Sequence, residues 1–176
     1  MKTSRAKVVR GFTLIETLIY IAIYSIIMAG ALVSVYAILG SSARNAMKAM
    51  VQEEGSFLIG KIDWALTGAQ SISQPTIGAS GATLSTTKYD ASIGNPIVIS
   101  LSGGDLTISR GGNPPQTLNN SNVQVSCAPV GCFAHASASG DGINPESVSA
   151  TITVHATTSE GLSYTQDFTT VKYLRK

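Results

Sequence analysis

The sequence predicts an α+β protein in which one long N-terminal helix is followed by an antiparallel β-sheet. Two changes of pattern along the chain carry this prediction. An apolar run from Phe12 to Leu39 continues into a segment whose apolar residues recur at helical spacing, and beyond Gly68 apolar and polar residues alternate as in half-buried strands. With 44% hydrophobic and only 12% charged residues, the chain is too apolar for a disordered protein.

Residues 1–11 form a basic leader. The leader contains no acidic residue and carries the basic residues Lys2, Arg5, Lys7 and Arg10. The rest of the chain has more acidic than basic side chains, so the net charge of +2 indicates no anionic partner for the body. Lys88, Arg110 and Lys172 are too few and too scattered for a nucleic-acid site, and we expect no nucleic-acid partner.

The apolar run at residues 12–39 is long enough to cross a membrane. It exceeds the roughly 20 residues that a spanning helix needs and the roughly 7 to 15 of an ordinary signal-peptide core. The leader precedes it, so the positive-inside rule keeps the leader cytoplasmic and sends the C-terminal body across the membrane. Two ordinary interpretations are a permanent single-pass anchor and a secretory signal cleaved at MAGA, Met28 to Ala31.

Neither interpretation accounts for Glu16, the one charged residue within the apolar run. A carboxyl near the start of a transmembrane helix costs on the order of 2 to 3 kcal/mol, and such residues usually face a partner. Glu16 is therefore the first candidate functional residue.

The residues around Glu16 resemble a known processing signature. Basic residues lead into Gly11 and Phe12, then into the stretch TLIE that ends at Glu16, and an uninterrupted apolar helix follows. This combination is similar to the N-terminus of type IV prepilins and of the pseudopilins of type II secretion. The resemblance implies a pilin fold, with the long helix packed on an antiparallel sheet, and a structural function without an enzymatic activity or a cofactor.

The resemblance also implies a processing step. A prepilin peptidase would cut after Gly11, where the missing Cβ allows close approach to the backbone, and would N-methylate the new terminus at Phe12. The new amine gives Glu16 a partner, either four residues away on the same helix or, as the resemblance implies, in a neighbouring subunit during assembly. The implied partners are the peptidase, other pilin or pseudopilin subunits, an inner-membrane assembly platform, and the lipid bilayer before assembly.

One feature departs from the family pattern. Many major pilins carry a proline within the apolar helix, whereas here Val33 stands near that point and the first proline is Pro75. Gly30 and Gly40 are the only candidate weak points of the run.

Residues 40–67 are expected to continue the helix in amphipathic form, so that one helix runs from about Thr13 to about Leu66. Trp64, near its end, is expected to cover the sheet. The opposite, polar face would carry Arg44, Lys48, Glu53, Lys61 and Asp63. The expected inward face consists of Met47, Met50, Val51, Phe57 or Leu58, Ile62, Ala65 and Leu66.

Residues 68–176 are expected to form a β-rich domain with a sheet of about four to six strands. Ser102-Gly103-Gly104-Asp105 is the turn of a predicted hairpin between residues 97–101 and 106–108. Further strands are predicted at residues 123–127, at 148–156, and from about 162 to 174 after a turn at 158–161. The predicted loops are residues 74–81, 110–115 and 136–145.

Cys127 and Cys132 are the only cysteines. In an exported domain they would form a disulfide, and in the cytosol they would stay free thiols. The predicted orientation places them outside the cytoplasm, so we predict a disulfide whose small loop contributes about 1 to 2 kcal/mol. Pilins often carry such a bond near the C-terminus, usually around a longer loop.

No catalytic or metal site is predicted. His135 follows the cysteines at a C-x4-C-x2-H spacing that lacks a fourth zinc ligand, and His155 lies on the polar side of a strand. The stretches SGG and RGG lack the context of phosphate loops. The acidic residues of the body are interpreted as solvated side chains in turns or on exposed faces: Asp90, Asp105, Asp141, Glu146, Glu160 and Asp167.

Together these features predict a single-pass precursor in the bacterial inner membrane, with its C-terminal domain outside the cytoplasm, that assembles into a type IV pilus or pseudopilus. The ending DFTTVKYLR resembles that of J- or W-type minor pilins and, with the Ser, Thr and Gly-rich body, favours a minor component. Minor pilus, type II secretion and DNA-uptake subunits are not separated by the sequence. The alternative is a signal-anchored extracytoplasmic binding domain that does not polymerise.

Overall fold

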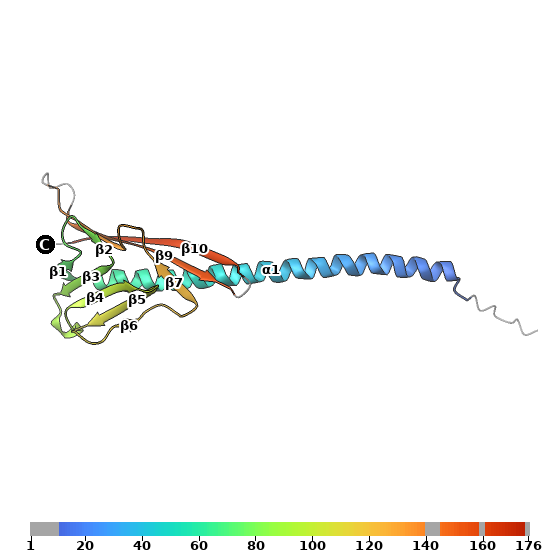
Figure 1. Ribbon diagram of the computed structural model, residues 1–176, viewed down its shortest axis with the longest axis horizontal. Helices are drawn as coiled ribbons and strands as arrows, with labels where there is room; N and C mark the ends of the chain where they lie inside the picture. The colour runs from blue at the N-terminus through green and yellow to red at the C-terminus, as the bar shows by residue number, and fades with distance from the viewer. Residues whose placement is uncertain (1–10, 140–144, 159–160, 175–176) are drawn as a thin grey trace, which may run out of the picture. The chain divides into compact units, whose positions relative to one another are not determined.

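The computed structural model describes residues 11–139, 145–158 and 161–174 (Figure 1). The leader at 1–10 and parts of two predicted connections, 140–144 and 159–160, lie outside the described residues. By its internal contacts the chain divides into two units, Met1–Arg44 and Asn45–Lys176. The described elements are one long helix with antiparallel β-sheets, which confirms the α+β prediction.

The helix, α1 (Leu14–Leu66), agrees with the predicted bounds. It continues through Gly30 and Gly40 without a break, because no proline removes an amide donor along its length. Between Phe12 and Leu39 every large apolar side chain is 43 to 79% exposed. Among the described helices α1 alone is long and apolar enough to span a membrane, with a mean hydropathy of 2.3 over its most apolar window.

The C-terminal half of α1 contributes one face to the core of the second unit. Most of the predicted inward residues are buried, but Met50 is 41% and Phe57 45% exposed, and Leu58 takes the inward position instead. Each residue advances about 100° around the axis, so a narrow stripe excludes residues at its margins. The buried residues of α1 are Met47, Val51, Gly55, Leu58, Ile62, Ala65 and Leu66.

The strands form two antiparallel five-stranded sheets rather than the single sheet that the sequence predicts. The first has the order β1 (Ala69–Gln74), β3 (Thr83–Lys88), β4 (Ile97–Ser102), β5 (Asp105–Arg110) and β6 (Gln116–Thr117). The second has the order β10 (Ser163–Tyr173), β9 (Ser147–Thr157), β8 (Phe133–Ala136) and β2 (Ser80–Gly81), and β7 (Val123–Ser126) also pairs with β9. A short 3-10 helix, η1 (Ala91–Ile93), precedes β4. In Figure 1 strands of both sheets lie beside the second half of α1, and residues of the helix and of both sheets share one core.

The predicted hairpin is confirmed as β4 and β5, with positive φ at both Gly103 and Gly104, as a two-residue turn requires. The predicted strands that became β7, β9 and β10 are also confirmed. Strands β1, β3 and β8 and the two-residue strands β2 and β6 were missed, and β2 (Ser80–Gly81) corrects the end of the loop predicted at residues 74–81. In β3 and β8 polar residues face the core, since Thr86 is 1%, Lys88 6% and His135 2% exposed, and an apolar alternation cannot detect them.

A buried asparagine joins the two sheets. The Asn119 side chain accepts a hydrogen bond from the amide of Leu106 (2.8 Å) and donates to the carbonyl of Val123 (2.9 Å). Beside it the amide of Val125 donates to the carbonyl of Gly104 (2.9 Å). Because a buried polar group without a partner costs about 1 to 3 kcal/mol, this side chain fixes how β5 and β7 meet.

Strand β10 is an edge strand that lies along α1. Phe168 covers Gly55, and Lys172 Nζ contacts Asp63 Oδ1 at 2.9 Å. At the other end of the strand, Lys48 Nζ lies 5.7 Å from the centre of the Tyr164 ring. A Cβ at residue 55 would overlap the Phe168 ring, so the glycine allows β10 to approach the helix.

We predict that Gly55→Ala lowers the free energy of unfolding by about 1 to 3 kcal/mol, because overpacking outweighs the gain in helix propensity. The matched control is Gly60→Ala on the same helix, where a Cβ meets nothing within 4 Å. This control should be neutral or more stable by up to about 1 kcal/mol. Thermal unfolding of both detergent-solubilised proteins measures the difference, and equal behaviour would contradict the proposed close contact.

Candidate functional site

The N-terminal candidate site begins in exposed, non-helical backbone. Gly11, Phe12 and Thr13 precede the helix, and nothing lies within 4 Å of a Cβ built on Gly11. The carbonyl of Thr13 accepts hydrogen bonds from the amides of Glu16 (3.1 Å) and Thr17 (3.2 Å), which starts α1. The bond between Gly11 and Phe12 is therefore accessible backbone directly ahead of a helix.

Glu16 lies in the first turn of α1, where the unpaired amides of a helix N-terminus favour a negative charge. Its side chain is partly buried, whereas those of its neighbours are exposed. The Phe12 ring packs edge-on against Tyr20, with ring centroids 6.2 Å apart. Glu16 and Tyr20 are spaced four residues apart on the helix and so share one face. Phe12 lies on the same side through its ring contact with Tyr20. No hydrogen bond or ion pair from another described residue reaches the Glu16 carboxylate.

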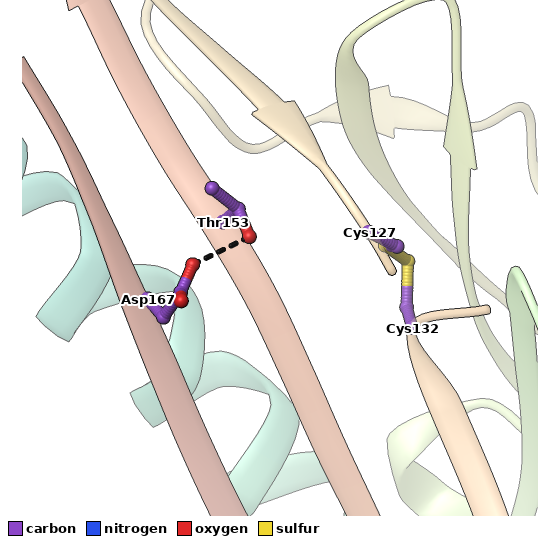
Figure 2. The surroundings of a disulfide bond; sticks show 4 residues. All are labelled: Cys127, Cys132, Thr153 and Asp167. Atoms are coloured by element: carbon purple, nitrogen blue, oxygen red, sulfur yellow. Dashed lines mark hydrogen bonds between the residues drawn. A yellow bond between two sulfur atoms is a disulfide. The ribbon is translucent and has the colours of Figure 1, made fainter. Parts of the chain in front are cut away.

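Cys127 and Cys132 are joined by a disulfide, shown in Figure 2, with Cα atoms 4.9 Å apart. Cys132 belongs to the core at 2% exposure, and its carbonyl accepts from the amide of Thr151 in β9 (2.8 Å). Gly131 makes the small loop possible, because a Cβ there would lie 2.6 Å from the backbone of Gly81. The loop is thus held against β2 and β9.

Figure 2 also shows a cross-strand bond in which the Thr153 hydroxyl donates to Asp167 Oδ1 (2.6 Å). Asp167 is exposed, as the sequence predicts for this acid, but it is hydrogen-bonded across β9 and β10. Asp90 caps η1, and hydrogen bonds from the hydroxyl and amide of Ser92 lower the pKa of its carboxyl.

His135 has partners that the sequence did not indicate. Its Nδ1 lies 2.9 Å from the carbonyl of Pro75 and its Nε2 lies 2.8 Å from Glu146 Oε1. Because a carbonyl can only accept, Nδ1 is the donor toward Pro75, and Nε2 faces the Glu146 carboxylate. His135 in β8 thus joins the loop after β1, through Pro75, to the residue before β9, Glu146.

This contact corrects the interpretation of Glu146 as a solvated acid, since its side chain is only 14% exposed. The contact between His135 and Pro75 could not be predicted, because the two residues are far apart in the sequence. His155 is partly exposed on the outer side of β9, opposite Thr165, in agreement with its expected place. Among the described residues no group of three or more histidine, cysteine, aspartate or glutamate side chains could hold a metal ion.

Two cations from the first sheet lie near the Trp64 ring. Lys88 Nζ is 3.9 Å and the Arg110 guanidinium 5.0 Å from its ring centre. Lys88 Nζ also donates to the carbonyl of Trp64 (2.5 Å) in the last turn of α1, where a cation stabilises the helix C-terminus. Burial lowers the pKa of the Lys88 ammonium, the charge of Arg110 lowers it further, and Asp90 acts in the opposite direction. The structure thus brings together two of the basic residues that are scattered in the sequence.

Two open depressions lie on the exposed side of α1 and share Phe57. The larger, of about 550 Å³, is lined by Ser56, Phe57, Gly60, Lys61, Trp64 and Arg110. The other, of about 410 Å³, is lined by Glu53, Glu54, Phe57, Leu118, Asn119 and Asn120. One depression therefore carries cations beside aromatic rings, and the other carries carboxylates.

Comparison with known proteins adds one finding. A family model described as the prokaryotic N-terminal methylation motif matches residues 7–32. The match covers Gly11, Phe12, Glu16 and the first part of the apolar run, and it ends before the second unit begins. No curated protein and no solved structure matches the chain.

We predict that replacing both cysteines by alanine lowers the free energy of unfolding by about 1 to 2 kcal/mol, because the unfolded chain loses a small closed loop. Thermal unfolding of the double variant, compared with the oxidised and the reduced wild type, measures this effect. The reduced wild type should unfold like the double variant. Thiol labelling of the purified, unfolded wild type that is equal before and after reduction would show that the bond does not form.

Proposed function

We propose that this chain, which carries the type IV prepilin signature at residues 7–32, is a structural subunit of a type IV pilus or pseudopilus. The observation that carries the proposal is the combination of this motif with a helix whose apolar side chains are all exposed from Phe12 to Leu39. Soluble monomers rarely expose contiguous apolar surface of this extent. Lipid before assembly and neighbouring helices after assembly would cover it.

In this proposal residues 1–11 are a cytoplasmic leader that prepilin peptidase removes by cutting after Gly11. Residues 12–39 are the membrane and filament-core helix, residues 40–67 its amphipathic continuation, and residues 68–176 the head domain outside the cytoplasm. The exposed, non-helical backbone at Gly11 and Phe12 supports cleavage at this bond. An inner-membrane platform would then add the subunit to other pilins or pseudopilins. The J- or W-like ending supports a minor subunit.

Glu16 would direct assembly by pairing with the methylated amine of a neighbouring Phe12. Its place in the first helical turn supports this role, because the amine of a processed chain stands at the same end of the helix. An isolated carboxylate in lipid is costly, so a subunit with its Glu16 paired is favoured over one that is free in the membrane. The charge thereby selects the assembled state and its register.

We predict that mass spectrometry of the protein purified from its own membrane finds an N-terminal, methylated Phe12. The Gly11→Val variant is the control and should keep its leader, because a branched side chain obstructs the backbone at the cleavage site. An intact Met1 in the wild type, or a terminus near Ala31, would instead support the non-polymerising binding domain.

We predict that Glu16→Leu reduces incorporation into filaments at least about tenfold, which corresponds to a loss of about 1.4 kcal/mol in assembly. Glu16→Asp keeps the charge and should retain more incorporation than the leucine variant. The amounts of sheared filament and membrane-bound protein are compared by immunoblotting, and the N-terminus is checked in the same samples. Unchanged incorporation of cleaved Glu16→Leu protein would refute the pairing role.

A further inference from the structure

We propose that the depression beside Trp64 is a carboxylate-binding site for a second copy of this chain, which places its Glu53 side chain between Lys61 and Arg110. The inference rests on the proposed function, because it concerns contacts between assembled subunits. It assigns a specific pair of residues to the contact and an axial offset to the two helices.

The depression has the composition of an anion site with an apolar wall. Its two charged lining residues are cations, Lys61 and Arg110, and no carboxylate lines it. Both cations lie near aromatic rings, with Lys61 Nζ 5.2 Å from the Phe57 ring centre and Arg110 5.0 Å from that of Trp64. No described carboxylate is within ion-pairing distance of either cation. A carboxylate from outside would complement both charges.

Gly60 lines the depression and places no side chain in it. A glycine inside a helix costs about 1 kcal/mol relative to alanine. At Gly55 the glycine is needed because a Cβ would overlap the Phe168 ring, whereas at Gly60 nothing lies within 4 Å of an added Cβ. Close approach of a partner at this point would give this glycine the same role that Gly55 has inside the domain.

Among the described acids of the second unit, Glu53 is the one without a polar contact to another described residue. It is exposed and has no hydrogen bond or ion pair with a described residue. Each of the other described acids in this unit has a polar contact, and Glu54, next in the chain, accepts from the amide of Asn120 (2.7 Å). The remaining contacts hold Asp63 to Lys172, Asp90 to Ser92, Asp105 to Asn119, Glu146 to His135 and Asp167 to Thr153.

Two copies of the helix can pair Glu53 with Lys61 only if one helix is shifted along its axis relative to the other. Glu53 and Lys61 are separated by about 12 Å along the axis and by about 80° around it. Two subunits inserted in one membrane have parallel helices, so an offset of this size brings one Glu53 level with the other Lys61. Without the offset, like charges would lie side by side.

Because Glu53 and Lys61 point in different directions around the helix, one subunit can place its Glu53 in the depression of one neighbour. Its own depression can then bind the Glu53 of another neighbour. Such a head-to-tail contact uses two different patches and leads to an open helical array instead of a closed dimer. A second copy is thus favoured over a free acidic ligand, since both halves of the contact belong to this chain.

The test is a charge exchange in the full-length chain, expressed in cells that assemble it. Glu53→Lys and Lys61→Glu should each lower filament incorporation about tenfold, and the double exchange should restore it to within about twofold of wild type. Gln52→Lys, which adds a charge at the neighbouring exposed residue, is the matched control and should have no effect. Gly60→Leu should lower incorporation without lowering the melting temperature, because it fills the depression.

Cross-linking identifies the partner. Two differently tagged copies, one with Glu53→Cys and one with Lys61→Cys, should form a disulfide-linked dimer in filaments. Failure of the double exchange to restore assembly, or absence of this cross-link, would overturn the inference. If Lys61→Glu lowered incorporation while Glu53→Lys did not, the site would bind another acidic ligand, and this result would overturn the inference as well. Failure of the proposed function is distinct, because wild-type protein would then lack the Phe12 terminus and would be absent from filaments.

Discussion

The structure depends on one helix that must be stabilised in two different surroundings. In its first half, the large apolar side chains of α1 from Phe12 to Leu39 are exposed. In its second half a narrow stripe, including Val51, Leu58 and Ile62, is fully buried in the core. Because the hydrophobic effect is proportional to the apolar area removed from water, only the second half is covered by the chain itself. In the proposed function lipid or other helices would cover the first half, which would link the fold to assembly.

Glu16 is the one charged residue in the apolar first half of this helix. The residue is placed where the helix dipole reduces the cost of a carboxylate, and where removal of the leader would create an amine four residues away. In the proposed function, removal of the leader would thus supply a positive charge that the sequence itself lacks near Glu16. In the second unit most charged groups likewise have a partner. Lys88 donates to a carbonyl in the last turn of α1, and most described acids contact a neighbouring polar group. In a chain with only 12% charged residues, a charge without an internal partner is informative.

Much of the fold was predictable because it is encoded in apolar periodicity. The bounds of α1 and the strands β4, β5, β9 and β10 follow from the spacing of apolar residues and from the Gly103-Gly104 turn. The division into two sheets was not predictable, because it depends on which strands pair across long sequence separations. Asn119, which joins the two sheets, is a polar residue whose partners are set by tertiary structure. Likewise Thr86 and His135 occupy inward positions that a hydrophobic pattern assigns to apolar residues. The candidate site from Gly11 to Glu16 could be predicted from the sequence, because its residue types are adjacent in the chain, and its role stays a prediction.

The candidate surface on α1 was invisible for the opposite reason. Phe57 fits the apolar stripe by composition, yet at 45% exposure it stands between the two depressions. Arg110 comes from the end of β5, so its proximity to Trp64 and Lys61 exists only after the first sheet has packed on the helix. The folded head thereby converts a weakly basic set of distant residues into a local cationic site. Since Glu53 and Lys61 belong to the same rigid helix, the offset between neighbours would be set by helix geometry, independently of flexible loops.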